Sequence, residues 1–233
     1  MTDVSKQMYE DFQLVYNNLA SNQAAGLDIY EISMYLTKAY FAYVTQLYNQ
    51  YEKSEMARKA LVELVKSEWL LPYAFVNSSN VKIHDNAVFF KLPDDVLYIV
   101  YESVKMGNTD SKCMRNKVLA VIPCTHDDFH QVSSNPFRLN ERNALRLDVY
   151  DKGRLSEIVA KDRHVEKYYL RYVKKPMPII LEDNFGPYGH PEDKIEGLNK
   201  ETVCELNSIY HADIVRSAAE MAYVDYKQSR NNV

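Results

Sequence analysis

Residues 96–106, VLYIVYESVKM, decide the fold class because they show most clearly that the middle of the chain has lost the helical periodicity of the first 66 residues. Apolar side chains occupy both odd and even positions of this stretch, which is typical of a strand that is covered on both faces. The Pro-Asp-Asp sequence at 93–95 predicts a turn, and the strand-like run at 81–92 before it completes a β-hairpin. The middle of the chain is therefore expected to be a β-region.

Short apolar runs downstream extend this β-region. They predict four further strands, at 117–124 (KVLAVIPC), 145–150, 167–173 (KYYLRYV) and 178–181 (PIIL). Pro176 and Pro178 have no N–H to donate to a sheet, so the segment at 167–181 is expected at a sheet edge or in a crossing between sheet positions. The β-region is predicted to be mixed or antiparallel.

Helical periodicity dominates both ends of the chain. Apolar residues recur at helical spacing from residue 3 to about residue 66. Asp28 and Glu31 form a capping pair at the start of the second helix, and a third helix is expected over 54–66. A C-terminal helix is expected near 208–228.

These patterns predict an α+β fold in one compact domain. It consists of a helical unit at 1–70, a β-region at 71–203 with a long loop at 182–202, and a C-terminal helix at 204–233 that packs back on the helices. A length of 233 residues suits one domain, and 46% hydrophobic with 26% charged residues argues against disorder. No segment approaches 18 uncharged apolar residues, so no membrane partner is expected.

Composition excludes several classes of function. The six glycines form neither GxGxxG nor GxxxxGK[ST], which argues against dinucleotide-binding and P-loop enzymes. Cys113, Cys124 and Cys204 are far apart without a CxxC pair, as expected for thiols in a reducing compartment. A net charge of -4 is unsuited to a globally basic nucleic-acid coat. The 19 tyrosines favour protein interfaces, because tyrosine joins a large apolar ring to a polar tip.

The residues suited to metal binding or catalysis form only weak patterns. His126 and His130 have the spacing of one helix face, but Pro123 before them favours a polar loop with a capping aspartate. Asp94, Asp95 and Glu102 loosely resemble the acidic sets by which nucleases hold Mg²⁺. No GxSxG elbow is present.

The sequence therefore predicts no catalytic residue, no cofactor and no metal site. A second loose set of carboxylates lies within 148–152, again without a well-spaced carboxylate pair and lysine. A Mg²⁺-dependent nuclease or phosphoesterase that uses Asp94, Asp95 and Glu102 is kept as the alternative function.

Charge is distributed unevenly along the chain. Residues 161–175 carry a net charge of +4 and residues 182–196 a net charge of -4. Opposed patches favour heterologous, head-to-tail contacts, the type that closes rings, although solvated edge strands are also often charged. The candidate interface residues are Arg163, Lys167, Arg171, Lys174, Lys175, Glu182, Asp183, Glu192 and Asp193.

Two arrangements are possible for the strand expected at 167–173. Tyr169 and Arg171 share one face, where stacking or hydrogen bonding would anchor a contact. In the alternative, Tyr168, Leu170 and Tyr172 form the core face and Arg171 simply faces solvent.

Three segments resemble one family of virion proteins. They are NPFRLNERNALRLDVYD at 135–151, KYYLRYVKKPMPIIL at 167–181 and CELNSIYHADIVRSAAEMAYVDY at 204–226. They resemble the ring proteins (head-to-tail adaptor and tail proteins) of crAss-like short-tailed bacteriophages. The resemblance extends over residues 120–226.

This resemblance implies a structural virion protein without a catalytic site, assembled in the host cytoplasm and located in the portal–tail region. Such proteins form stacked rings, commonly twelvefold, that continue the portal channel, and DNA passes through without specific binding. The expected partners are copies of the chain itself, the portal protein, and neighbouring ring or tail muzzle proteins. A capsid accessory or cargo protein without its own ring is the other alternative.

Overall fold

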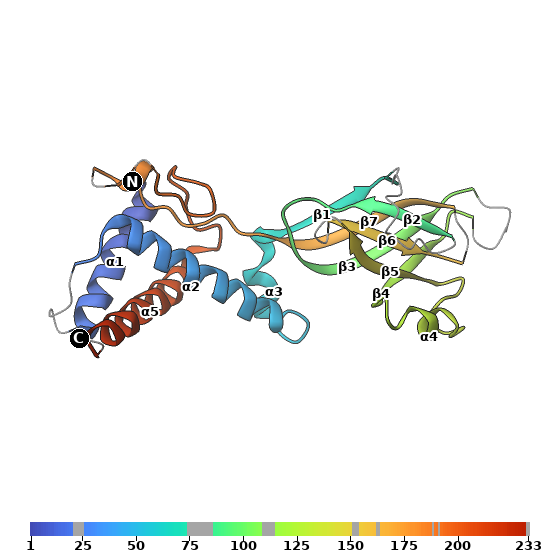
Figure 1. The fold of residues 1–233 in the computed structure, drawn as a ribbon, viewed down its shortest axis with the longest axis horizontal. Coiled ribbons are helices and arrows are strands. Elements are labelled where there is room, and N and C mark those ends of the chain that lie inside the picture. Colours follow the sequence, from blue (N-terminus) through green and yellow to red (C-terminus); the bar gives the residue numbers. More distant parts are fainter. Residues whose placement is uncertain are drawn as a thin grey trace. The chain divides into compact units, whose positions relative to one another are not determined.

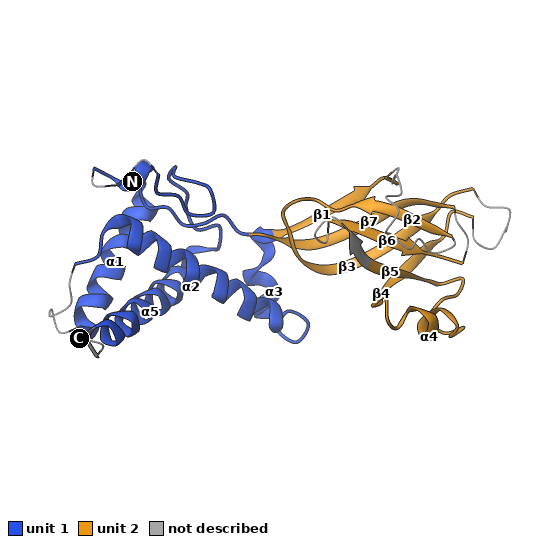
Figure 2. Ribbon diagram, in the orientation of Figure 1, with its two compact units in different colours: residues 1–64, 176–233 blue, residues 65–175 orange. Residues whose placement is uncertain are grey.

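The structure is a computed structural model that describes residues 1–20, 26–73, 86–108, 115–150, 154–161, 164–187, 189–190 and 192–231. The chain divides into two compact units (Figure 2). Unit 1 contains Met1–Leu64 and Pro176–Val233, and unit 2 contains Val65–Lys175. This division differs from the single domain with boundaries after residues 70 and 203 that the sequence suggests, because the segment after Lys175 groups with the helices.

Long helices build unit 1. They are α1 (Asp3–Leu19), α2 (Ile29–Asn49) and α5 (His211–Asn231) (Figure 1). Helix α5 packs against both α1 and α2, which confirms the expected return of the C-terminal helix. Phe12, Leu36 and Ala218 are fully buried on the faces that helical spacing predicts. The capping box of Asp28 and Glu31 is also confirmed, with each side chain accepting from the other residue's backbone N–H.

The third helix is shorter than its periodicity predicts. Helix α3 covers Glu55–Ala60, the 3-10 turn η1 covers Val62–Leu64, and strand β1 begins at Val65. The helix expected to reach Lys66 is therefore wrong in its last turn. Pairing of β1 with a distant strand overrides the local helical pattern there.

The chain that returns to unit 1 runs along α2 instead of joining a sheet. The N–H groups of Ile179 and Leu181 donate to the hydroxyl oxygens of Thr37 (3.0 Å) and Ser33 (3.2 Å) on α2. The strand expected at 178–181 is therefore wrong: it is reduced to a single antiparallel bridge between Ile180 and Thr202, because side chains of α2 accept from the N–H groups on either side. Two 3-10 turns follow: η2 (Asp183–Phe185) and η3 (Ser208–Tyr210).

Unit 2 is a curled mixed sheet. Its described strands are β1 (Val65–Leu70), β2 (Ala87–Lys91), β3 (Val96–Met106), β4 (Val118–Pro123), β5 (Asn143–Tyr150), β6 (Leu155–Val159) and β7 (Val165–Lys174). Their spatial order is β1-β7-β3-β4-β5-β6-β2, in which β4 and β5 run parallel and the other described pairs antiparallel. The N–H of Tyr73, just after β1, donates to the carbonyl of Phe89 in β2 (2.7 Å). The two ends of the strand order therefore approach each other.

Strand pairing corrects two predictions. The hairpin expected across 93–95 does not form among the described strands, because β2 pairs with β6 whereas β3 pairs with β4 and β7. The turn itself is present, with the N–H of Val96 donating to the carbonyl of Pro93 (3.3 Å). Strand β7 is not at an edge, because β1 and β3 flank it, and Pro176 lies beyond its last residue, Lys174.

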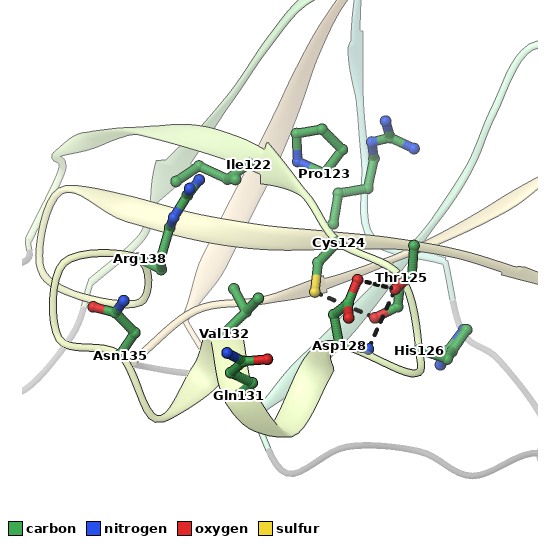
Figure 3. A pocket seen from close by; sticks show the side chains of 11 residues that line it. Ile122, Pro123, Cys124, Thr125, His126, Asp128, Gln131, Val132, Asn135 and Arg138 are labelled. Carbon is green, nitrogen blue, oxygen red and sulfur yellow. Dashed lines mark hydrogen bonds between the residues drawn. The ribbon is translucent and has the colours of Figure 1, made fainter.

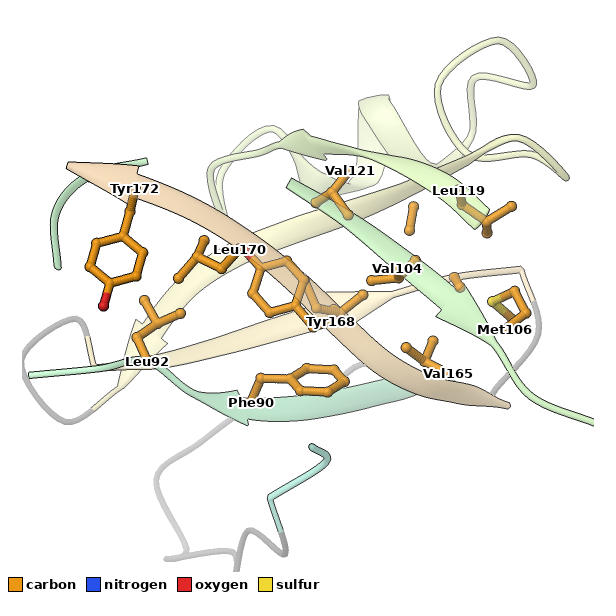
Figure 4. Packing of buried hydrophobic residues seen from close by; sticks show 13 residues of the cluster. Phe90, Leu92, Val104, Met106, Leu119, Val121, Val165, Tyr168, Leu170 and Tyr172 are labelled. Atoms are coloured by element: carbon orange, nitrogen blue, oxygen red, sulfur yellow. The ribbon is translucent and has the colours of Figure 1, made fainter. Parts of the chain in front are cut away.

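The inner face of the sheet holds the core of unit 2 (Figure 4). Tyr168, Leu170 and Tyr172 of β7 are fully buried and pack in one cluster with Phe90 and Val104. This confirms that these β7 residues form the core face. The intervening side chains consequently point to the outer face of the sheet.

Strand β3 is covered on both faces only in its second half. Glu102–Val104 is buried, whereas Leu97 is 37% and Tyr101 52% exposed. The register of β3 against β7 shifts twice in the exposed half, which marks bulges that turn side chains away from regular alternation. The prediction of a strand covered throughout is wrong for this half.

Candidate subunit interface

The basic candidates of the sequence analysis gather on strand β7. Lys167 and Arg171 lie on its outer face with Tyr169, because every second residue of a strand points the same way. Arg171 is exposed and Lys167 half-buried, and within the described residues neither forms an ion pair. Arg163 lies outside the described residues. The outer face of β7 therefore presents cationic groups toward solvent.

Lys174 and Lys175 continue this basic stretch at the end of β7. Lys174 is half-buried and Lys175 exposed. The N–H of Lys175 donates to the carbonyl of Asp95 (2.6 Å), which fixes the backbone just after the strand. These two lysines are thus held on an ordered segment.

Two aromatic residues that the sequence analysis missed flank Tyr169 on the outer face. The ring centroid of Trp69, on β1, lies 5.1 Å from that of Tyr169, and the ring centroid of Tyr101, on β3, lies 6.0 Å from it. Trp69 was missed because residues 1–70 were assigned to the helical unit, with no strand expected among them. The apolar and polar residues of VKSEWL (65–70) do not alternate, and neither does the exposure of its side chains, so no local strand signal reveals Trp69.

The acidic candidates lie together in unit 1, within the loop that was expected at 182–202. Asp183 accepts a hydrogen bond at Oδ1 from the N–H of Glu201 (2.7 Å). Asp193 accepts at Oδ2 from the N–H of His190 (2.9 Å). These side chains shape the loop by fixing its backbone.

An apolar anchor holds the same loop against α2. The Phe185 side chain is 2% exposed, clusters with Ile180 and Ile195, and meets the ring of Tyr30 edge-on at 4.9 Å. Glu192 is exposed on the same loop. The acidic and basic candidates therefore lie in different units, each set on a folded segment.

The carboxylate of Glu102, one of the nuclease candidates, is engaged inside the sheet. Arg146 Nε lies 2.8 Å from Glu102 Oε2, and the Tyr168 hydroxyl donates to the same oxygen (2.5 Å). The side chains of Arg146 and Glu102 are only 9% and 8% exposed. A carboxylate neutralised and buried in this way is unsuited to hold a catalytic Mg²⁺.

The other two nuclease candidates are engaged separately. Asp95 Oδ2 lies 2.6 Å from Lys66 Nζ, and Asp94 Oδ1 lies 3.3 Å from the Arg154 guanidinium. Burial acts to raise the pKa of Asp95, but hydrogen bonds from Lys66 and Tyr172 outweigh it and hold this pKa below its ordinary value. Within the described residues, no group of three metal-binding side chains comes together.

A cavity of about 720 Å³ opens beside α4 (Phe129–Ser133), in the connection between β4 and β5 (Figure 3). Inside it, the Thr125 hydroxyl donates to Asp128 Oδ2 (2.7 Å), and the Asp128 N–H donates back to Thr125 Oγ1 (3.2 Å). His126 lines the cavity and His130 does not, so the histidine pair is not brought into one site.

Burial disfavours the thiolate form of both described cysteines. Burial, assisted by the Asp128 carboxylate, raises the pKa of Cys124. Burial also raises the pKa of Cys204 to about 11, so both thiols are protonated at neutral pH. Cys113 lies outside the described residues.

The carboxylates of Asp94, Asp95 and Glu102 form ion pairs, and both described thiols are protonated. The exposed basic candidates lie in unit 2 and the exposed acidic candidates in unit 1, as expected for a protein that assembles with other proteins. Comparison with known proteins agrees. A family model described as phage tail ring protein 3/4 matches residues 1–233, and the chain belongs to this family of crAss-like phage ring proteins.

Two curated relatives come from Bacteroides phage crAss001. Ring protein 3 is 30% identical over 241 residues, which cover 98% of each chain. Ring protein 4/5 is 28% identical over 229 residues, 93% of this chain and 91% of that protein. The expected resemblance is confirmed, and it extends well beyond residues 120–226.

Family membership decides between the alternatives for the kind of protein. The relatives are structural ring proteins and not enzymes, so the nuclease interpretation of Asp94, Asp95 and Glu102 is set aside. A tail ring protein is a component of the virion. Among the described residues, no helix combines the length and apolarity needed to cross a bilayer.

Proposed function

We propose that this chain forms a twelve-subunit ring in the portal–tail assembly and continues the DNA channel from the portal into the tail. The observation that carries the proposal is the separation of charge between units, together with family membership. Arg171 and Lys175 are exposed in unit 2, and Asp183 and Glu192 are exposed in unit 1. A subunit with two different complementary surfaces associates head to tail, which closes a ring when the rotation permits.

The overall charge supports passage of DNA without specific binding. A protein that neutralises many phosphates holds DNA tightly, with an affinity that falls steeply as salt rises. A chain with a net charge of -4 has no overall excess of positive charge with which to bind DNA phosphates tightly. The basic residues of β7 are thus left for contacts with protein.

Mass photometry of the purified protein, alone and mixed with the portal protein of the same virus, tests the proposal. Twelve subunits of 27.1 kDa give a ring of about 325 kDa. Discrete complexes that contain this mass are expected, with or without the portal. A monomer that ignores both the portal and the neighbouring ring proteins would contradict the proposal.

Charge reversal tests the contact itself. The double variant Lys174→Glu/Lys175→Glu is expected to abolish ring-sized complexes, because it places like charges opposite the neighbour's carboxylates. The control Lys91→Glu/Lys117→Glu makes the same change in net charge at two exposed lysines elsewhere in unit 2. Assembly that survives the first variant as well as the control rules out this contact.

A further inference from the structure

An aromatic row crosses the outer face of the sheet in unit 2. Trp69, Tyr169 and Tyr101 lie on β1, β7 and β3, which are adjacent strands (Figure 1). Their neighbouring ring centroids are 5.1 Å and 6.0 Å apart. Trp69 is 51% and Tyr101 52% exposed, and Trp69 is the only tryptophan of the chain.

The fold of unit 2 does not require this row. The core lies on the opposite face of β7, where Tyr168, Leu170 and Tyr172 are fully buried. Large aromatic side chains left half in water lose the free energy that their burial would provide. A contiguous exposed row of this kind marks an interaction surface rather than a scattering of single apolar residues.

The composition of the surface matches the residues that dominate binding energy at protein interfaces. Trp, Tyr and Arg are the types most enriched among such residues. Arg171 lies two residues beyond Tyr169 on the same face, opposite Tyr101 in the register of β7 with β3. An exposed guanidinium beside an aromatic row is suited to a partner that offers carboxylates next to a compact apolar surface.

We propose that the aromatic row with Arg171 receives the acidic loop 182–196 of a second copy of this chain. This inference rests on the proposed ring and identifies the apolar anchor of its subunit contact. We choose this loop as the occupant because its charge is complementary: the loop has a net charge of -4, and residues 161–175, which include β7, have a net charge of +4. Pro187 is exposed among the loop's acidic residues and supplies an apolar group to lie against the rings.

The described parts of both surfaces are fixed within each chain before the two surfaces meet. The row is fixed by the ladder of β1, β7 and β3, and the loop by the buried Phe185 and the hydrogen bond that Asp183 accepts. Little conformational entropy is then lost on association. The contact is heterologous, so each copy keeps one free row and one free loop until a ring closes.

The single tryptophan gives a direct test. On ring formation, the emission of Trp69 is expected to shift to shorter wavelength, and its quenching by acrylamide to fall. Trp69→Phe serves as the blank for tryptophans of an added portal and is expected to assemble, because it retains an aromatic ring. Rings in which Trp69 stays as quenchable as in the monomer overturn this inference and leave the proposed ring intact. Absence of rings overturns both.

Complementation of two variants tests the occupant. Trp69→Ala is expected to weaken association at least about 30-fold, as for a residue that dominates an interface. The control Phe137→Ala, at a side chain 84% exposed elsewhere in unit 2, leaves association unchanged. Asp183→Asn/Glu192→Lys removes charge from the loop while Asn can still accept from the Glu201 N–H.

Neither the Trp69→Ala chain nor the loop variant forms rings alone. Mixed, they form a dimer and stop there, because only one intact row and one intact loop meet. Failure of the mixture to dimerise, with both variants folded by circular dichroism, overturns the assignment of the loop as occupant. Burial of Trp69 in the monomer at all protein concentrations overturns it too, because the row would then be covered within one chain.

Discussion

Replacing Arg146 by methionine is expected to destabilise unit 2 more than most single substitutions. The guanidinium pairs with Glu102 at 2.8 Å where both side chains are nearly excluded from water. Methionine fills much of the same volume but leaves the Glu102 carboxylate with the Tyr168 hydroxyl and without its cation. Removing one member of a buried ion pair costs about 3–5 kcal/mol, because the remaining charge stays desolvated.

Urea unfolding followed by the emission of Trp69 measures this cost in unit 2, where the tryptophan lies. With m-values of about 1–3 kcal/mol per molar urea for small proteins, a loss of 3 kcal/mol lowers the midpoint by at least about 1 M. The double variant Glu102→Gln/Arg146→Met is expected to recover part of the loss, because it buries no charge.

An exposed ion pair provides the control. Lys161 lies 3.5 Å from Glu141 with both side chains at least half exposed, so Lys161→Met is expected to change stability by less than about 1 kcal/mol. If Arg146→Met shifts the midpoint no more than this control does, the Glu102–Arg146 pair does not stabilise the sheet as reasoned.

Two further predictions concern unit 1. Burial acts to raise the pKa of Glu201, but hydrogen bonds from Thr2 and Ser5 outweigh it and lower this pKa to about 2 from an ordinary 4.5. The ionised carboxylate therefore stabilises the fold above pH 4.5, and this stabilisation is lost as the pH falls toward 2. In acid unfolding measured by circular dichroism, the stability of the Glu201→Gln variant should depend less on pH between 4.5 and 2. Phe185→Ala is expected to cost about 3–5 kcal/mol in unit 1, read as a lower thermal midpoint, whereas Lys194→Ala on the same loop should leave the midpoint nearly unchanged.

The sequence alone was sufficient to predict those features that depend on residues close together in the chain. The capping box at Asp28, the helical faces of α1, α2 and α5, and strands β4 and β5 follow from spacing and side-chain chemistry over a few residues. The sequence likewise offered the arrangement with Tyr168 and Tyr172 buried and Arg171 exposed as one of two alternatives for this strand. The basic and acidic candidates of the interface came from the same local counting of charge.

Only the tertiary structure decided which segments meet. Strand β1 was hidden in a helical pattern because its partner, β7, lies about 100 residues away, and β2 pairs with β6 instead of with β3 across the Pro93 turn. The pairing of strands depends on how the faces of the whole sheet pack. This is a long-range interaction that a short stretch of sequence does not reveal. For the same reason, Trp69 and Tyr101 joined Tyr169 in one row only once the order β1-β7-β3 was known.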